Sequence, residues 1–250
     1  MRSAFSILLA ACALVAVAAP AALANAAQGN RVVVAIVDTG VSPTKQLAPH
    51  LLPGWDFVDN DANATDQNGH GSEIASIVTT RCPNCSILPV RVIGGSGMGS
   101  ADMAVEGIKW AVVHGAQVIN LSMTTTSDNP ELSAAIQAAV LAGVTTVVAA
   151  GNSGQPVGYP GATTPGAITV GSVDASGNRY AWSNYGPWVS ALAPGVLQAR
   201  SSFGKTVSAV GTSASAGYVS GLVGRALQCD PQLTPAQTRA LAAANTLPSC

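Results

Sequence analysis

The chain has 250 residues, with 11 lysine and arginine residues against 12 aspartate and glutamate residues. Charged residues make up only 9% of the chain and form no long run of one sign, which argues against a nucleic-acid-binding protein. Hydrophobic residues make up 48% of the chain and 26 residues are glycine, a composition suited to one large core with tight turns.

The N-terminal segment predicts export. Arg2, an apolar run from Ala4 and the small residues of ALANA have the pattern of a secretory signal peptide cleaved after Ala24 or Ala26. The segment LAAC also fits a lipoprotein-type cleavage before Cys12. No later apolar stretch is long enough to span a bilayer. We therefore expect a signal peptide over residues 1–26 and one secreted or periplasmic domain over 27–250, with no evident propeptide.

Strand-like and helix-like segments alternate along this domain. The expected strands are rich in β-branched residues and show little alternation of apolar and polar residues, as strands covered on both faces do. Expected helices begin with a capping residue, in two cases followed by proline, and two of them end at a glycine. The pattern predicts an α/β fold of three layers, with a mostly parallel central sheet and helices on both faces. The strands are expected over 31–37, 87–93, 117–121, 144–150 and 167–173, and the helices over 100–115, 129–143, after 213 and from 234.

Cysteines and acidic residues raise two further questions. Signal removal leaves an even number of cysteines, which predicts disulfide bonds in an oxidising compartment. Proximity favours Cys82 with Cys85 and Cys229 with Cys250, although RCPNC also fits a redox or zinc role. No cofactor is expected to be required. Calcium remains an alternative in the stretch DFVDNDANATDQ, which lacks the glycine and distal glutamate of an EF-hand loop and offers Asp56, Asp59, Asp61, Asp66, Asn60 and Asn63.

Three segments carry the residues for nucleophilic catalysis: VAIVDTG with Asp38, NGHGSEIA with His70, and GTSASA with Ser213. A serine hydroxyl is a poor nucleophile near neutral pH and needs a base, which a histidine supplies. A carboxylate on the other ring nitrogen fixes the tautomer and stabilises the imidazolium. The order Asp, His, Ser therefore predicts an acyl-transfer triad.

A fourth segment, VVAAGNSG, completes this prediction. Asn152 follows an apolar strand-like run, where its amide N–H can face the negative charge of a tetrahedral intermediate. A second donor is expected from the backbone N–H of Ser213, because that serine lies where a loop enters an apolar helix. A turn asparagine is the structural alternative for Asn152.

These motifs, in this order, resemble the subtilisin-like serine proteases. The resemblance extends over residues 31–245 through ILPVRV, GSGMGS, GIKWAVVHGAQVINLSM, VGYPGA, ITVGSVD, WSNYG, LAPGV and LTPAQTRAL. It implies a serine endopeptidase acting on polypeptides, with two strands that hold an extended substrate and a primary specificity pocket. Space at Gly158 predicts cleavage after Phe, Tyr, Leu or Met. The resemblance assigns Gly97, Met98 and Gly99 to one strand, Ser122, Met123 and Thr124 to the other, and Ala150, Gly151 and Gly158 to the pocket.

The chain also departs from the family pattern. Gly217 stands where the family usually has proline, which predicts a looser setting for Ser213, and Thr124 stands where a glycine is usual. The long inhibitory propeptide of secreted members is not evident, so we expect either unaided folding or a separate folding or toxin partner chain. The alternatives to a protease are a catalytically weak peptide-binding homologue and an esterase or acyltransferase using the same triad.

Overall fold

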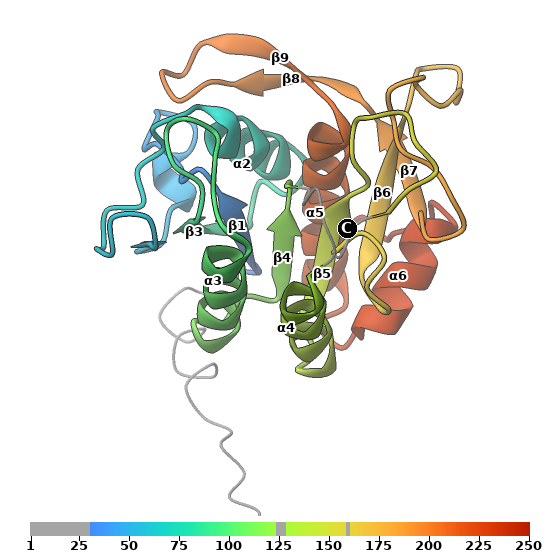
Figure 1. The fold of residues 1–250 in the computed structure, drawn as a ribbon, viewed down its shortest axis with the longest axis horizontal. Helices are drawn as coiled ribbons and strands as arrows, with labels where there is room; N and C mark the ends of the chain where they lie inside the picture. The colour runs from blue at the N-terminus through green and yellow to red at the C-terminus, as the bar shows by residue number, and fades with distance from the viewer. Residues whose placement is uncertain (1–30, 124–128, 159–160) are drawn as a thin grey trace, which may run out of the picture.

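The computed structural model describes residues 31–123, 129–158 and 161–250. The predicted signal peptide, residues 1–26, and Thr124 lie outside these residues. Every predicted strand and helix inside them is present, and the α/β class is confirmed (Figure 1). None of the described helices is both long and apolar enough to cross a bilayer.

A seven-stranded sheet forms the central layer, with the strand order β2-β3-β1-β4-β5-β6-β7 and parallel pairing throughout. Two short edge strands, β2 and β7, and a separate antiparallel hairpin of β8 and β9 add to the predicted elements. The strand bounds are β1 Val33–Asp38, β2 Trp55–Asp56, β3 Ser86–Arg91, β4 Val118–Leu121, β5 Thr145–Ala149, β6 Ile168–Val173, β7 Ala191–Pro194, β8 Val196–Arg200 and β9 Thr206–Val210.

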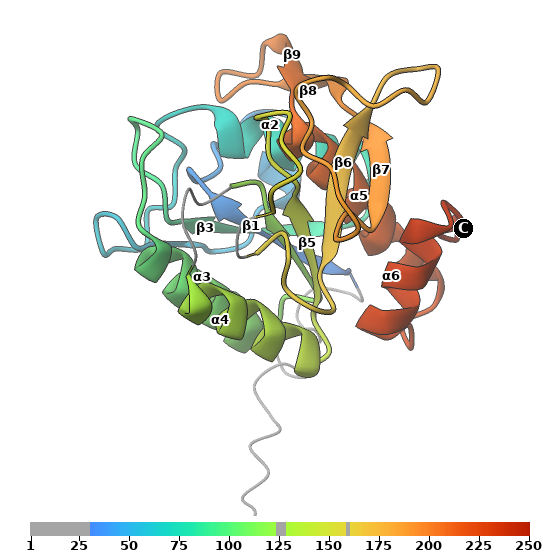
Figure 2. The ribbon, with the colours of Figure 1, turned by 45° about the vertical axis from the view of Figure 1, so that its right-hand side comes forward.

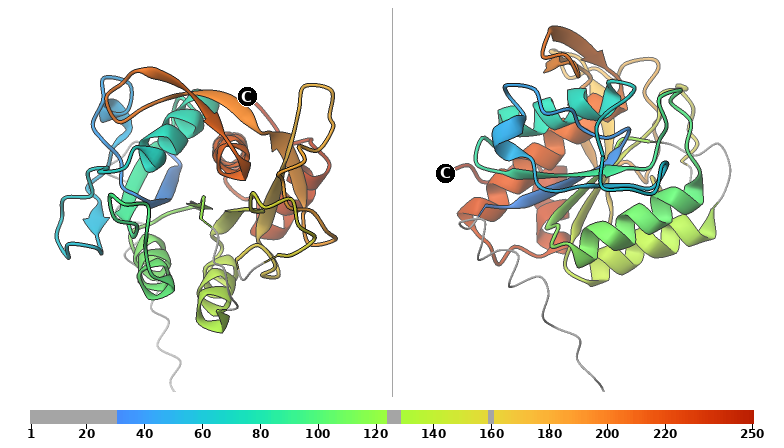
Figure 3. Two further views of the ribbon diagram at one scale, coloured as in Figure 1. Left: turned by 45° about the horizontal axis from the view of Figure 1, so that its top comes forward. Right: turned by 90° about the vertical axis from the view of Figure 1, so that its left-hand side faces the viewer.

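Helices cover both faces of the sheet (Figure 3). Strand β1 explains why, because Val34 and Ile36 belong to one hydrophobic core while Val33, Ala35 and Val37 belong to the other. On the second face, α3 and α4 lie side by side (Figure 2). The first face carries α2 His70–Arg81, α5 Thr212–Cys229 and α6 Pro235–Ala243, the second carries α3 Ala101–Val113 and α4 Pro130–Leu141, and a 3-10 turn, η1, covers Ala48–His50.

Two disulfides join the cysteine pairs that sequence proximity favours. Cys82–Cys85 closes the end of α2, and its two side chains are fully buried against Gly224 of α5. Cys229–Cys250 ties the C-terminal residue to the end of α5. Because Cys82 and Cys85 are bonded to each other, the RCPNC segment does not supply thiolates to a zinc ion.

The acidic stretch after β2 is held by protein groups. The guanidinium of Arg91, only 2% exposed, pairs with Asp56 and donates to Asp59 at 2.7 Å and to Gln67 at 3.0 Å. Asp66 is satisfied by hydroxyl and amide donors, and the residues described here contain no cluster of three or more metal-ligating side chains. Both carboxylate oxygens of Asp56 and of Asp66 are therefore occupied by protein donors.

Arg91 offers a stability test. Substitution Arg91→Met leaves Asp56 buried without its cation, so we expect the free energy of unfolding to fall by about 3–5 kcal/mol. The matched control is Lys109→Met, which removes the surface ion pair of Lys109 with Glu106 and is expected to cost at most about 1 kcal/mol. Urea unfolding of both variants measures the difference, and equal losses would contradict the role of Arg91.

Candidate active site

The site lies at the carboxyl edge of the sheet, where open α/β sheets bind ligands. Asp38 is the last residue of β1, and His70 is the first residue of α2. The His70 Nδ1 atom lies 2.7 Å from Asp38 Oδ1, and the backbone N–H of Thr39 donates to the same oxygen at 2.7 Å. Asp38 is fully buried while the His70 side chain is 35% exposed, so the imidazole has one protected and one accessible edge.

The local charges favour the protonated imidazole. The negative charge of Asp38 is the largest influence and raises the pKa of His70 from 6.5 to about 9, against the opposing effect of burial. The hydrogen bond with Asp38 and the charges of Glu73 and Asp66 act in the same direction. Burial in turn raises the pKa of Glu73. His70 therefore lies in a wholly acidic charge environment.

Ser213 lies in the first turn of α5 and contacts the segment that follows β4. Its hydroxyl donates to the backbone oxygen of Ser122 at 3.1 Å, and the Ser122 hydroxyl donates to the backbone oxygen of Ser213 at 3.2 Å. Among the residues described, this Ser213 hydroxyl has no hydrogen bond to His70. Such bonds are often long without substrate. The structure thus joins Asp38 to His70 directly and places Ser213 beside Ser122, which lines the same cavity as His70.

Asn152 is oriented by a neighbour of Ser213. Its Oδ1 accepts from the backbone N–H and the hydroxyl of Thr212, at 2.8 and 3.0 Å, while the Thr212 hydroxyl accepts from the Gly151 N–H at 3.0 Å. With Oδ1 occupied, the amide nitrogen of Asn152 is the group left to meet a ligand. A side chain on Gly211 would approach that nitrogen within 3.2 Å. Sequence reasoning missed Thr212, although its position directly before Ser213 was a usable signal.

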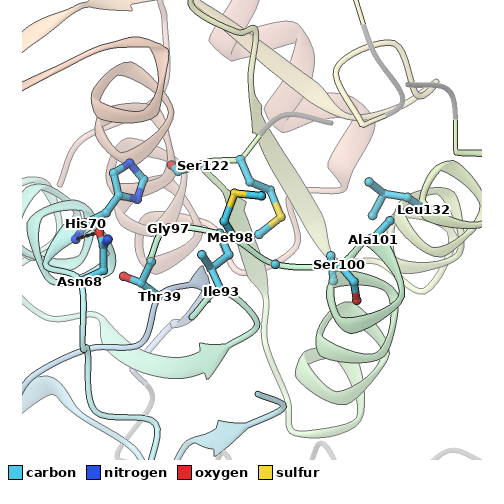
Figure 4. A pocket seen from close by; sticks show the side chains of 13 residues that line it. Thr39, Asn68, His70, Ile93, Gly97, Met98, Ser100, Ala101, Ser122 and Leu132 are labelled. Carbon is cyan, nitrogen blue, oxygen red and sulfur yellow. Dashed lines mark hydrogen bonds between the residues drawn. The ribbon is translucent and has the colours of Figure 1, made fainter. Parts of the chain in front are cut away.

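A cavity of about 610 Å³ runs from His70 and Ser122 at one end to Leu132 at the other (Figure 4). Apolar side chains of Ile93, Met98, Met123 and Leu132 form part of its lining. Ala101 and Ala104, near the start of α3, also line it and have small side chains. Of the expected substrate-binding residues, Gly97, Met98, Gly99, Ser122 and Met123 line this cavity, together with Thr39, Asn68, Ile93, Ser100 and the residues already named.

The residues expected to form the primary specificity pocket, Ala150, Gly151 and Gly158, are not among those that line this cavity. Ala150 and Gly151 directly follow β5 and hold Asn184 and Thr212 through backbone hydrogen bonds. At Gly158 the expectation of open space is wrong, because a Cβ there would lie 2.4 Å from the Thr163 methyl and 2.8 Å from the Trp188 ring. The glycine therefore makes room for this protein's own side chains.

Close packing explains why glycine stands at two other positions, 99 and 217. Gly99 approaches the backbone oxygen of Val92 so closely that a Cβ would lie 2.5 Å from it. Gly217 lies within the uninterrupted α5 and packs on α2, where a Cβ would meet Ile74 at 3.1 Å. At both positions glycine allows elements of the protein to pack closely.

The comparisons with known proteins identify the family. The model of the subtilase family matches residues 29–247. The chain belongs to the subtilase family. This confirms the resemblance to subtilisin-like serine endopeptidases.

This subtilase is 34% identical to the alkaline protease of Alkalihalobacillus alcalophilus over 234 residues, which cover 89% of the chain and 61% of that protein. It is 38% identical to thermitase of Thermoactinomyces vulgaris over 211 residues, covering 79% and 75%. A crystal structure of a cold-adapted subtilisin-like serine proteinase superposes with a TM-score of 0.82 at 32% identity, covering 85% of this chain and 81% of that one. The chain thus spans less than two thirds of the alkaline protease.

Proposed function

We propose that this subtilase is an endopeptidase that hydrolyses peptide bonds through Asp38, His70, Ser213 and Asn152. The observation that carries the proposal is the contact of His70 Nδ1 with the buried Asp38 carboxylate at 2.7 Å, at the mouth of a peptide-sized cavity. This contact fixes the tautomer that leaves Nε2 able to accept a proton. Membership of the subtilase family supports the same chemistry.

In the proposed reaction, the Ser213 hydroxyl turns from the Ser122 carbonyl towards His70 and attacks the substrate carbonyl carbon. The proton passes to His70 Nε2, and the carbonyl electrons move to the oxygen, which faces the Asn152 amide and the Ser213 N–H. Collapse of this intermediate breaks the C–N bond, and the departing amine takes the proton from His70. Water then repeats the sequence on the acyl-enzyme and releases the acid and free Ser213.

We propose polypeptides as substrates, bound as an added strand beside Gly97–Gly99 and the segment from Ser122. The apolar side chains of Met98, Met123 and Leu132 in the cavity support recognition of large apolar substrate side chains. Cleavage after Phe, Tyr, Leu or Met is the specific form of this proposal. Turnover of chromogenic peptides ending in Phe, Ala, Arg or Glu tests it, and fastest hydrolysis of the Arg or Glu peptide contradicts it.

The cavity itself offers a mutational test. Ala104 is buried at the start of α3, and Ala104→Phe fills the space beside it with an aromatic ring. For peptides with a large apolar residue upstream of the cleaved bond we expect KM to rise by about tenfold at nearly constant kcat, because an apolar contact is lost in both ground and transition states. The control is Ala138→Phe on the exposed side of α4. An unchanged KM would remove the cavity from the binding site.

Casein hydrolysis combined with labelling by a serine-reactive fluorophosphonate distinguishes the candidate functions. Proteolysis with labelling supports the endopeptidase. Labelling without proteolysis favours an esterase or acyltransferase, and the absence of both favours a peptide-binding homologue.

Acidic groups around His70 lead to a pH prediction. His70 must be neutral to act as the base. We therefore expect kcat/KM to fall on the acid side with a midpoint above pH 6.5, shifted towards the His70 pKa of about 9. The same pKa shift affects stability, because folding favours the protonated form of His70. The His70–Asp38 pair therefore contributes fully to the free energy of unfolding below pH 6.5, and this contribution is lost as the pH rises through about 9. Glu73→Gln removes a negative charge and is expected to move the acid limb of kcat/KM to lower pH.

The control for Glu73→Gln is Glu106→Gln, which neutralises an exposed carboxylate on α3. The pH profile of kcat/KM is measured for both variants and for the unmodified enzyme. A limb that stays in place for Glu73→Gln, or moves equally for both variants, contradicts a local effect on His70.

We further propose export of a single peptidase domain over residues 27–250, supported by the signal-like N-terminal sequence. Refolding the mature chain from denaturant tests whether it folds unaided. Recovery only with an added factor would indicate a partner chain.

A further inference from the structure

The helix that carries His70 begins without a capping side chain of its own. Gly69 is its N-cap residue, with φ +116°, and offers no side-chain acceptor. The N–H groups of a first helical turn need acceptors from elsewhere. The Gly71 N–H donates to the Thr39 hydroxyl at 2.9 Å, and the Ser72 N–H donates to Asp66 Oδ2 at 2.9 Å. The start of α2 is therefore fixed by the neighbour of Asp38 and by a carboxylate.

Asp66 is the centre of this arrangement. It is 7% exposed and accepts five hydrogen bonds in all. Oδ1 accepts from the Thr39 hydroxyl at 2.8 Å and from the N–H groups of Asn68 and Gly69 at 2.9 and 2.7 Å. Oδ2 accepts from the N–H and hydroxyl of Ser72 at 2.9 and 2.6 Å. One carboxylate thus holds both the segment after Asp38 and the segment around His70.

The segment after Asp38 and the start of α2 also pack directly backbone against backbone. A Cβ on Gly71 would lie 2.1 Å from the backbone oxygen of Gly40. Gly40 itself has φ +95°, and the next residue, Val41, donates its N–H to the Ala64 oxygen at 2.9 Å. Because the crossing is this tight, a shift of the Asp66 loop moves the start of α2 relative to Asp38.

We propose that Asp66 is a positioning residue, which ties the first turn of α2 to Thr39 and so fixes the His70 imidazole against Asp38. This inference rests on the proposed acyl-transfer function. The carboxylate form is required, because all five bonds run from donors to its two oxygens. An asparagine of the same shape would turn an NH2 group towards at least two N–H or O–H donors.

The same carboxylate acts on His70 through its charge. The groups whose charges act on the imidazole are Asp38 at the end of β1, Glu73 on α2 and Asp66 in the preceding loop, and all three raise its pKa. Removing the charge of Asp66 is therefore expected to lower the pKa of His70. Breaking the link through Thr39 removes no charge, and it lowers this pKa only if the imidazole moves away from Asp38, the largest influence on it. Position and charge can be separated by two variants.

The experiment compares Asp66→Asn with Thr39→Val. For Asp66→Asn we expect kcat to fall by about a hundred-fold with KM nearly constant, since misplacement of a catalytic group by about 1 Å has effects of this size. The acid limb of kcat/KM is expected to move to lower pH. For Thr39→Val we expect a smaller loss of kcat, about tenfold, and a smaller shift of the limb in the same direction. Asp174→Asn, which removes a partly exposed carboxylate that also accepts turn N–H groups, serves as the control.

A second readout does not depend on turnover. The pKa of His70 is measured by NMR titration of 13C-labelled histidine, with the signals of His50 and His114 assigned through their glutamine variants. A lower His70 pKa in Thr39→Val, which removes no charge, supports the positioning role even if the protein hydrolyses no peptide, an outcome that would refute only the proposed function. If Asp66→Asn does not fold, the kcat of Thr39→Val decides. Unchanged kcat and His70 pKa, with only a lower Tm, would reduce Asp66 to a structural residue.

Discussion

Ser213→Ala is expected to abolish peptide hydrolysis almost completely while leaving the fold and peptide binding intact. The Ser213 hydroxyl is the nucleophile in the proposed reaction, and alanine leaves the His70–Asp38 contact in place. Subtilisins lose on the order of a million-fold in kcat when this group is removed, and we expect a loss of that size here. The remaining rate reflects the oxyanion donors and substrate binding alone.

The measurement is hydrolysis of a chromogenic peptide, with binding of the same peptide followed by fluorescence. Ser202→Ala, in the turn between β8 and β9, is the matched control because it removes a hydroxyl outside the proposed machinery. Loss of fluorophosphonate labelling in Ser213→Ala but not in Ser202→Ala identifies the nucleophile. Retained hydrolysis in Ser213→Ala would show that another group, or a contaminating protease, performs the reaction.

Asn152→Ala is expected to lower kcat by about a hundred- to a thousand-fold and to change KM little, the range that subtilisins show for this donor. The reason lies in the geometry, because Thr212 occupies Oδ1 and leaves the amide nitrogen available for the oxyanion of the proposed reaction. That interaction forms in the transition state and not in the substrate complex, so the effect belongs to kcat.

Thr212→Val provides a graded companion to this variant. It removes the hydroxyl that donates to Asn152 while the Thr212 backbone N–H still donates at 2.8 Å. We expect a smaller fall in kcat than for Asn152→Ala, and little further loss when the two substitutions are combined. Asn178→Ala, in an exposed turn, is the control. Additive losses would contradict the view that Thr212 acts through Asn152.

Local patterns determined a large part of this protein. Capping residues such as Asn129 and Thr234 marked helix starts correctly, because both side chains accept the N–H of the third helical residue. The continuous apolar strands were a correct sign of a sheet covered on both faces. The short edge strands β2 and β7 and the β8–β9 hairpin escaped notice, because they are brief or only half-buried and lack that signal.

By itself, the sequence determined the fold class, the favoured cysteine pairs, the subtilase resemblance and the candidate residues of the reaction, because each has a signal within a short segment or in the order of segments. Only the tertiary structure decided how these residues are supported. Thr212 meets Asn152 across 60 residues and Arg91 meets Asp56 across 35, distances over which no periodicity or spacing reports a contact. The filled space at Gly158 and the hydrogen bond between Thr39 and Asp66 depend in the same way on which distant side chains pack together.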